Sequence, residues 1–312
     1  MNDIATSKNS QITVVGAGWA GLAASTLLVE HGYKVNLIEA AQQPGGRARS
    51  VSMDGMDLDN GQHIMLGAYL ELRGLLNILG LAESDIFIRT RLNLDMYCMR
   101  GAGLQMKAGK LFSPLHMMSA LLFARGLSLT EKWKVSRCWM MFLRSGFTLD
   151  QDMPVVDFLE QHYQSARLQK LFWRPVCIAA LNTDTDKASM QVFLNVLKRS
   201  FTGCRSNSDM LLPKAGLDKV LPGPASEFIR QHGGTVRTGE RLLKINIDAD
   251  GDTVTDIETS KGNYPVSRLV LATPYRQSRK LLAQLGHFTA LTESMSAFTD
   301  EPITTLYMQF PQ

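Results

Sequence analysis

Cysteines are scarce in this chain, and long runs of apolar or basic residues are missing. The four cysteines lie far apart, and none stands in a CxxC pair or beside a histidine at zinc-ligand spacing. We therefore expect free thiols in a reducing compartment, with no disulfide framework and no metal site. No stretch offers the roughly 18 uncharged apolar residues of a membrane-spanning helix. Basic residues are scattered and the net charge is +4, which gives no indication of a nucleic-acid partner.

The composition is otherwise that of an ordinary globular protein. Its 312 residues are 45% apolar and 20% charged, which suffices for more than one packed unit. The N-terminal residues MNDIATSKNS are polar and lack the apolar core of a signal peptide, so we expect a cytoplasmic protein.

Methionine, by contrast, is abundant, with 16 residues. Many of them lie close together in the sequence, namely Met96, Met99, Met106, Met117, Met118, Met140 and Met141. Such flexible side chains serve either as filler in a core or as a pliable lining for a bulky apolar ligand, and composition alone favours filler.

Residues 11–50 have the pattern of a βαβ unit. Apolar residues predict a buried strand over 12–15, and their helical spacing over 22–28 predicts a helix. Gly32 follows, where a left-handed helix cap is favoured. A second apolar strand is predicted over 35–38. The fold class is therefore α/β, with a Rossmann-type domain.

The turn between strand and helix is Gly16-Ala17-Gly18-Trp19-Ala20-Gly21. A GxGxxG motif alone is weak, but this one follows a strand, opens a helix and precedes an acid, Glu39, by 18 residues. Gly16 allows the tight turn, Gly18 lets a pyrophosphate approach the backbone, and Gly21 lets helix and strand pack closely. The helix start at Trp19, Ala20 and Gly21 presents free N–H groups to the phosphates. Glu39 is expected to accept hydrogen bonds from the adenosine ribose.

A second motif, Pro44-Gly45-Gly46-Arg47-Ala48-Arg49-Ser50, follows this acid. Arg47 directly follows the glycine pair Gly45-Gly46. Its side chain can reach back to the pyrophosphate, for which a bidentate guanidinium is suited. The glycines and the acid alone leave NAD and FAD open. The whole pattern VVGAGWAGLAAS…LIEA…GGRARS resembles the flavin-containing amine oxidase and phytoene or carotenoid desaturase superfamily, and this resemblance implies FAD as the cofactor.

Residues 71–210 are predicted to be mostly helical. Helical spacing of apolar residues predicts helices near 72–79, 114–125 and 129–147. The helix over 129–147 mixes basic with large apolar side chains. Two interpretations of it stay open: a helix that lies on an anionic membrane surface, or a surface helix of a helical cap.

After residue 210 the pattern changes to a helix over 216–232 and short strands. The strands are predicted at 235–237, 241–249, 253–260 and 269–272. The resemblance implies that this region is a second FAD segment, in which the backbone of Leu242 meets the adenine and Ala272 belongs to the VxATP motif.

The resemblance thus implies an FAD-binding domain interleaved with an α+β substrate domain. We expect residues 1–70 and 211–285 to form the FAD domain and residues 71–210 to form the substrate or cap domain. Residues 286–312, with a strand over 303–310, should begin the substrate-domain sheet. The superfamily has a later glycine-containing segment and a closing helix, which this sequence lacks, so we expect a C-terminally truncated chain.

Three stretches narrow the resemblance to one branch: DNGQHIMLGAY (59–69), FWRPVCIAALNT (172–183) and LPKAGLDKVLPGPASEFI (212–229). They resemble the squalene-associated FAD-dependent desaturases, the bacterial hydroxysqualene dehydroxylases. This implies reduction of hydroxysqualene to squalene for hopanoid synthesis, with hydride from reduced flavin. The reaction needs an apolar tunnel, an acid that helps hydroxide leave, and a well-positioned flavin.

His63 is the candidate acid, with Gln62 beside it, because in the superfamily this segment runs toward the flavin ring. The alternative is that His63 holds the flavin edge or a backbone carbonyl without proton transfer. Asp59 is expected to hold the turn at Gly61 through its side chain. Asn182 either faces the substrate or caps a helix.

Other functions stay open beside this one. They are a carotenoid-type desaturase, a flavin amine oxidase, and a non-catalytic flavoprotein subunit that hands polyprenyl intermediates to partner enzymes. The methionine-rich middle favours a lipid over a small amine. The partners expected are therefore an apolar polyprenyl substrate such as hydroxysqualene, squalene synthase-like enzymes, and the surface of the inner membrane.

Overall fold

The computed structural model describes residues 11–97, 103–251, 253–308 and 310. Contacts divide the chain into two compact units. Unit 1 consists of Met1–His63, Glu71–Ile88 and Pro213–Gln312, and unit 2 consists of Ile64–Leu70 and Arg89–Leu212.

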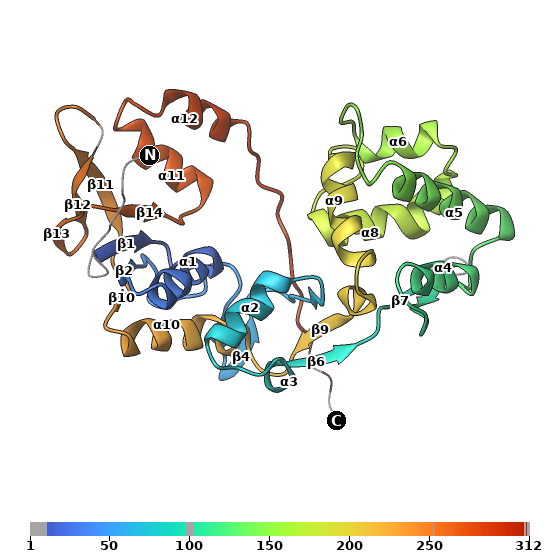
Figure 1. The fold of residues 1–312 in the computed structure, drawn as a ribbon, viewed down its shortest axis with the longest axis horizontal. Coiled ribbons are helices and arrows are strands. Elements are labelled where there is room, and N and C mark those ends of the chain that lie inside the picture. Colours follow the sequence, from blue (N-terminus) through green and yellow to red (C-terminus); the bar gives the residue numbers. More distant parts are fainter. Residues whose placement is uncertain (1–10, 98–102, 252, 309, 311–312) are drawn as a thin grey trace. The chain divides into compact units, whose positions relative to one another are not determined.

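Unit 1 is built on a parallel four-stranded sheet with the order β10-β2-β1-β14 (Figure 1). Its strands are β1 (Gln11–Val15), β2 (Lys34–Ile38), β10 (Thr235–Arg237) and β14 (Leu269–Leu271). The first βαβ unit is therefore completed on both sides by strands from the C-terminal third. The α/β fold with a Rossmann-type domain is confirmed.

Successive side chains of the sheet serve two different cores, since a strand points them alternately to opposite faces. Val14 and Leu37 belong to the core that the helices α1 (Trp19–Glu30) and α10 (Pro222–Gln231) cover. Val15 and Ile38 belong to a second core, which contains side chains of an antiparallel sheet and a helix. The sheet is thus buried on both faces, as the continuous apolar pattern predicts.

The antiparallel sheet of that second core consists of β11 (Leu242–Ile247), β12 (Val254–Thr259) and β13 (Gly262–Pro265). The other elements of unit 1 are the hairpin β3 (Ser50–Met53) and β4 (Met56–Asp59), the helices α2 (Leu70–Ile78), α3 (Glu83–Ile86), α11 (Tyr275–Ala283) and α12 (Thr289–Ser296), and a 3-10 turn, η3 (Leu217–Lys219). The division into units falls within two strands, β6 (Phe87–Thr90) and β9 (Met210–Pro213), which share a sheet with β5 (Met65–Leu66).

Unit 2 is mainly helical. It contains a hairpin of β7 (Asn93–Met96) and β8 (Leu104–Lys107), followed by α4 (Leu115–Leu122), α5 (Leu129–Arg144), α6 (Val155–Gln161), α7 (Ala166–Leu168), the π-helix η1 (Gln169–Trp173), α8 (Arg174–Leu181), α9 (Met190–Phe201) and the 3-10 turn η2 (Arg205–Ser208). The start of α5 is fixed by a capping box between Ser128 and Glu131.

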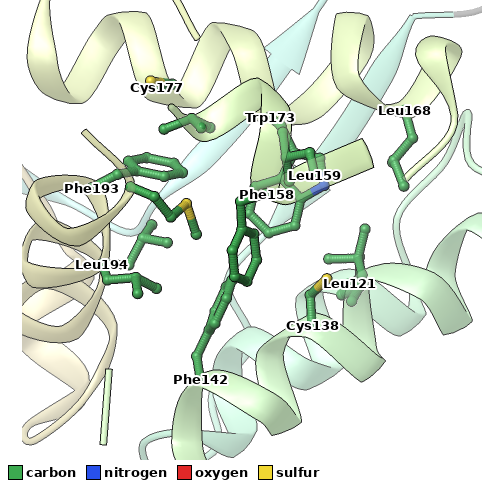
Figure 2. Close-up of a cluster of buried hydrophobic side chains, with 14 of the residues drawn as sticks. Leu121, Cys138, Phe142, Phe158, Leu159, Leu168, Trp173, Cys177, Phe193 and Leu194 are labelled. Atoms are coloured by element: carbon green, nitrogen blue, oxygen red, sulfur yellow. The ribbon is translucent and has the colours of Figure 1, made fainter. Parts of the chain in front are cut away.

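The core of unit 2 is rich in aromatic side chains (Figure 2). Phe142 of α5 is 1% exposed and packs against Phe158 and edge-on against Trp173. The buried indole of Trp173 donates a hydrogen bond of 3.0 Å to the side chain of Gln164. A polar network inside an apolar core specifies how these helices pack, because each polar group must find its partner.

The structure corrects three predictions from the sequence. The helix expected over 216–232 is interrupted, because Pro222 starts a separate helix after η3 and cannot continue one. The strand expected over 303–310 is wrong for the described residues, which pair with no described strand. Part of the expected substrate domain, residues 71–88, clusters with unit 1, as do the described residues of 286–312, where α12 packs on α11.

Candidate functional site: a dinucleotide site and an apolar cavity

The turn between β1 and α1 has the geometry of a phosphate-binding loop. Gly16 has a φ of +101°, and a Cβ there would lie 2.6 Å from the carbonyl oxygen of Ala272. A Cβ on Gly21 would lie 1.8 Å from the carbonyl oxygen of Gly16, so the start of α1 needs glycine to approach β1. Around Gly18, by contrast, a Cβ would meet nothing closer than 4.0 Å. The open space at Gly18 is therefore left for a ligand, as a pyrophosphate requires.

The glycine pair lies directly against this turn. The N–H of Gly45 donates a 2.7 Å hydrogen bond to Ala17, and Gly45 forms a parallel bridge with Gly18. A Cβ on Gly46 would lie 3.0 Å from the Cα of Gly18. The glycine turn over 16–21 and the glycine pair, which are separated in the sequence, thus form one surface on which no side chain covers the backbone.

Glu39 follows β2 and turns its carboxylate toward the same loop. Its two oxygens accept hydrogen bonds from the backbone N–H groups of Ala17, at 2.6 Å, and Ala41, at 2.8 Å. A carboxylate oxygen has a further lone pair, so each can also accept from a ribose hydroxyl. The half-buried Glu39 is thereby held in one position beside the loop, and its ribose contact stays a prediction.

The arginines of the second motif differ in their surroundings. Arg47 is exposed, and its guanidinium makes no ion pair within the described part of the chain. The Nε of Arg49 is buried and has no hydrogen-bond partner among the described residues. A buried guanidinium donor normally has an acceptor, and a bound diphosphate supplies one. Nothing in the sequence distinguishes Arg49 from Arg47, because the burial of Arg49 depends on how the segment folds back.

The other predicted cofactor residues lie around this loop. The indole of Trp19 donates to the carbonyl of Ala48 at 2.8 Å, which ties α1 to the glycine-arginine segment, and the neighbouring Ala20 is exposed. Ala272 donates its N–H to Val15 and forms the wall under the turn. Leu242 begins β11, and its side chain lies in the core that contains Val15.

Gln62 and His63 lie at the end of the first segment of unit 1. Nδ1 of His63 is 3.0 Å from the carbonyl oxygen of Gly61. A carbonyl can only accept a hydrogen bond, so Nδ1 carries the hydrogen and Nε2 remains the atom that can bind or release a proton. Gln62 is exposed and His63 is half-buried. The structure thus leaves both predicted roles of His63 open.

Asp59 has a different role from the one expected. The turn at Gly61 is closed by the backbone, since the Gly61 N–H donates to the carbonyl of Asp59 at 2.7 Å. The Asp59 carboxylate instead accepts hydrogen bonds from the hydroxyl of Ser50, at 2.7 Å, and from the N–H of Leu217, at 2.8 Å. It therefore ties the glycine-arginine segment to the turn η3 at Leu217, a long-range contact that no local pattern reveals.

A cavity of about 280 Å³ lies entirely within unit 2. Its walls are overwhelmingly apolar and include Met96, Met106, Met117, Met118 and Met210, together with Trp139, Phe172, Trp173 and Phe201. Four members of the methionine cluster thus line a ligand-sized cavity. Met141 packs against the core, Met140 is exposed, and Met99 lies outside the described residues. The structure therefore favours the lining interpretation for this group of residues.

The two buried cysteines of unit 2 that the structure describes, Cys138 and Cys177, are unreactive thiols. Burial raises the pKa of the Cys138 thiol to about 11, and burial and then Asp184 raise that of Cys177 to about 11. A thiol with so high a pKa is not a nucleophile at neutral pH. Asn182, the other candidate near the substrate, has a φ of 50° and caps α8 in the left-handed conformation.

Neither a metal cluster nor a membrane-spanning helix is found among the residues that the structure describes. Among these residues, no group of three histidine, cysteine or acidic side chains could hold a metal ion. None of the helices in this part of the chain is long and apolar enough to cross a membrane.

Comparison with known proteins gives consistent matches. The profile of the family "flavin containing amine oxidoreductase" matches residues 19–312. A hydroxysqualene dehydroxylase from Sinorhizobium fredii is 25% identical over 281 residues, which are 88% of this chain and 64% of the relative. A zeta-carotene desaturase from Arabidopsis thaliana is 26% identical over 271 residues, which are 80% of this chain and 47% of the relative.

Solved structures show the same fold. An oxidoreductase from Methanosarcina mazei superposes with a TM-score of 0.69 at 16% identity, over 92% of this chain and 65% of that one. At this identity the likeness concerns the fold alone. The chain spans less than two thirds of the length of these curated relatives and of this solved structure.

Proposed function

Since the chain belongs to the flavin containing amine oxidoreductase family, with FAD as its cofactor, we propose that it is an oxidoreductase acting on a long-chain isoprenoid. The most specific form of the proposal is the reductive dehydroxylation of hydroxysqualene to squalene. The observation that carries it is the methionine-lined cavity of unit 2, which suits an apolar chain and offers few polar contacts. The relative from Sinorhizobium fredii bears the name of this activity.

The reaction balances with reduced flavin as the only other reactant. The allylic C–O bond breaks, the hydroxyl takes up a proton and leaves as water, and a hydride adds to the allylic carbon. Bound FAD, once reduced, supplies this hydride and is oxidised. The protein contributes binding, orientation and the proton.

The cofactor is held by residues of unit 1 in this proposal. The backbone at Gly18 and Gly46 and the guanidiniums of Arg47 and Arg49 bind the diphosphate, and Glu39 binds the ribose. The remaining predicted contacts, namely Gly16, Trp19, Ala20, Gly21, Leu242 and Ala272, shape the loop and its walls.

His63 supplies the proton in the same proposal, with Gln62 beside it. Its Nδ1–H is held by the Gly61 carbonyl, so Nε2–H of the imidazolium is the group that protonates the leaving hydroxyl. His63→Gln should keep FAD and lose turnover by about a hundredfold, the lower end of general acid contributions. His232, whose Nδ1 also lies on a backbone carbonyl but which is exposed, is the matched control, and His232→Gln should retain full turnover. Unchanged turnover in His63→Gln would leave His63 with a structural role.

The test of the reaction is anaerobic incubation of the protein with FAD, a chemical reductant and hydroxysqualene, followed by mass spectrometry of the extract. We expect squalene, and none when FAD is omitted. The second candidate is a carotenoid-type desaturase, which the Arabidopsis relative supports. That activity would instead give a product with additional double bonds from oxidised FAD, and an amine oxidase would release peroxide from an amine.

Partners and location belong to the proposal as well. An enzyme with so insoluble a substrate is expected to work beside the inner membrane and next to squalene synthase-like enzymes that make its substrate. A subunit without catalysis of its own would bind FAD and show turnover only when these partners are added, which the same assay distinguishes.

A further inference from the structure

Helix α4 and the segments around it expose a concentrated set of large apolar side chains. We call this set the α4 surface, and it consists of Phe112, Leu115, Met118, Leu122, Phe123, Leu129 and Trp133. Phe112 is 70% exposed, Phe123 is 79% exposed and Leu129 is 81% exposed. Single exposed apolar residues are ordinary on a protein surface, but seven large ones within 22 residues of sequence are a concentration that a water-exposed surface rarely carries.

Helical spacing places three of these side chains on one face of α4. Leu115, Met118 and Leu122 are separated by three and four residues, so they form one stripe along α4. The start of α5 adjoins the end of this stripe, because Nζ of Lys132 donates a 2.7 Å hydrogen bond to the carbonyl of Leu122. The surface is therefore shared by two neighbouring helices of unit 2 (Figure 1).

The same helix also forms a wall of the apolar cavity. Met117, Met118 and Leu121 of α4 line the cavity, and Leu121 is buried in the core (Figure 2). Met118 is common to both faces, since it lines the cavity and is 36% exposed. One helix thus separates the cavity from the exposed apolar surface, and a flexible methionine lies at the boundary.

The charge on this part of unit 2 is mainly positive, although the exposed Asp95 lies on β7, which pairs with β8. Residues 104–144 contain seven lysines and arginines and one acid, Glu131. That acid is buried and paired with Arg167, so it does not offset the exposed cations. Lys110 and Arg125 are exposed and lie in sequence on either side of α4. Exposed apolar side chains with cations in the same stretch of chain are complementary to an anionic lipid surface.

We propose that the α4 surface docks on an anionic lipid bilayer and that α4 admits the apolar ligand from the bilayer into the cavity. The second half of this inference rests on the proposed function, and the first half does not. A symmetric pair of two copies would place the same patches against each other and bring their cations together, which disfavours that occupant. A bilayer supplies both the apolar interior and the anions at once.

Vesicle co-sedimentation tests the docking without any turnover. The protein should sediment with phosphatidylcholine vesicles that contain phosphatidylglycerol and only weakly with phosphatidylcholine alone. Lys110→Glu with Arg125→Glu should lower the partition coefficient by at least about fivefold, the effect expected for one basic contact near the surface. The control pair Lys170→Glu with Lys198→Glu, on exposed sites of unit 2 outside the α4 surface, should bind as the wild type does.

The apolar half of the surface has its own variants. Leu122→Gln with Phe123→Gln should lower partitioning by about tenfold or more, because two large side chains no longer enter the bilayer. The matched control is Ile178→Gln with Val192→Gln, which changes two exposed apolar residues of unit 2 on α8 and α9. Equal losses in both pairs, or none in either, would overturn the docking surface. A dimer in light scattering that the Leu122/Phe123 variant dissociates would assign the surface to a second copy instead.

Turnover measurements then distinguish docking on the bilayer from ligand entry past α4. With substrate dissolved in detergent the Leu122/Phe123 variant should match the wild type, and with substrate in vesicles it should lose turnover in proportion to its binding. Equal turnover from vesicles by both proteins would overturn the role of α4 in ligand entry. Vesicle binding without any conversion of hydroxysqualene would contradict the proposed function and leave the docking intact.

Discussion

The close approach of α1 to β1 makes Gly21 a sensitive probe of the dinucleotide site. A Cβ at this position would lie 1.8 Å from the carbonyl oxygen of Gly16, whereas ordinary contacts begin at 3.4 Å. In Gly21→Ala the backbone of the turn or the start of α1 must therefore move by more than an ångström. Overpacking against rigid backbone costs about 3 kcal/mol, and alanine in a helix returns about 1 kcal/mol. We expect a net loss of stability of about 2 kcal/mol.

Gly74 of α2 provides the matched control for this substitution. It is also a helical glycine, but it is exposed and a Cβ there would meet nothing within 4 Å. Gly74→Ala should therefore stabilise the protein by about 0.5–1 kcal/mol, the difference in helix propensity alone. Both variants replace a helical glycine by alanine, so the opposite signs of their expected changes in stability isolate the effect of the contact between Gly21 and the turn.

The assay is urea unfolding of the FAD-free proteins followed by circular dichroism, together with a titration of each protein with FAD. Gly21→Ala should shift the unfolding midpoint down and bind FAD far more weakly, and Gly74→Ala should shift the midpoint up and bind FAD normally. Wild-type stability and wild-type FAD affinity in Gly21→Ala would refute the assigned geometry of the loop.

Three further predictions follow from individual contacts. Arg49→Met should raise the dissociation constant of FAD by about tenfold or more without unfolding the protein, because the diphosphate loses the donor that the buried Nε provides; titration of flavin fluorescence checks this. Arg167→Met should cost about 1–2 kcal/mol and make the protein less sensitive to acid. Burial raises the pKa of Glu131, but the hydrogen bonds from Arg167 and Ser128 outweigh it and hold the pKa below its usual value. The wild type should therefore lose this contribution to its stability as the pH falls through the pKa that Glu131 has in the folded protein. Free energies of unfolding that change with pH in the same way in both proteins would contradict the pairing. In a Cys98→Ser background, a thiol reagent should label the exposed Cys204 rapidly and the buried Cys138 and Cys177 only on unfolding; fast native labelling of more than one thiol would disprove their burial.

Features that depend on neighbouring residues in the sequence could be predicted well. The roles of Gly16 and Gly21 follow from one short motif, because strand, turn and helix are consecutive, and the structure places both in close backbone contacts. Glu39 could be found in the same way, since it ends the next strand. FAD as the cofactor came from the resemblance of the whole pattern and not from the glycines.

Features that depend on how distant segments meet could not be predicted. The bridge between Gly18 and Gly45 and the contact of Asp59 with Leu217 join parts of the chain that no periodicity connects. The buried Nε of Arg49 is another result of that folding. The strand expected over 303–310 is an element that was predicted but is not found among the described residues. Its apolar pattern favours a strand, but a strand also needs a partner strand, which the pattern cannot reveal.

The methionine cluster lies between these cases. The sequence shows the abundance of methionine but cannot tell core filler from cavity lining, because both need the same flexible apolar side chain. In the structure Met106 and Met117 have both roles, because they belong to or pack against the core of unit 2 and also line the cavity, whereas Met141 packs against that core without lining the cavity. A substrate site made by several helices is visible only once they are packed together.

Hydrogen transfer to the substrate tests the central claim most directly. The protein, FAD and a chemical reductant are incubated anaerobically with hydroxysqualene in D₂O, where the transferable hydrogen of reduced flavin exchanges with solvent. The account predicts squalene that carries a single deuterium at the carbon that bore the hydroxyl. Squalene without deuterium, or conversion only to a more unsaturated product, would contradict it.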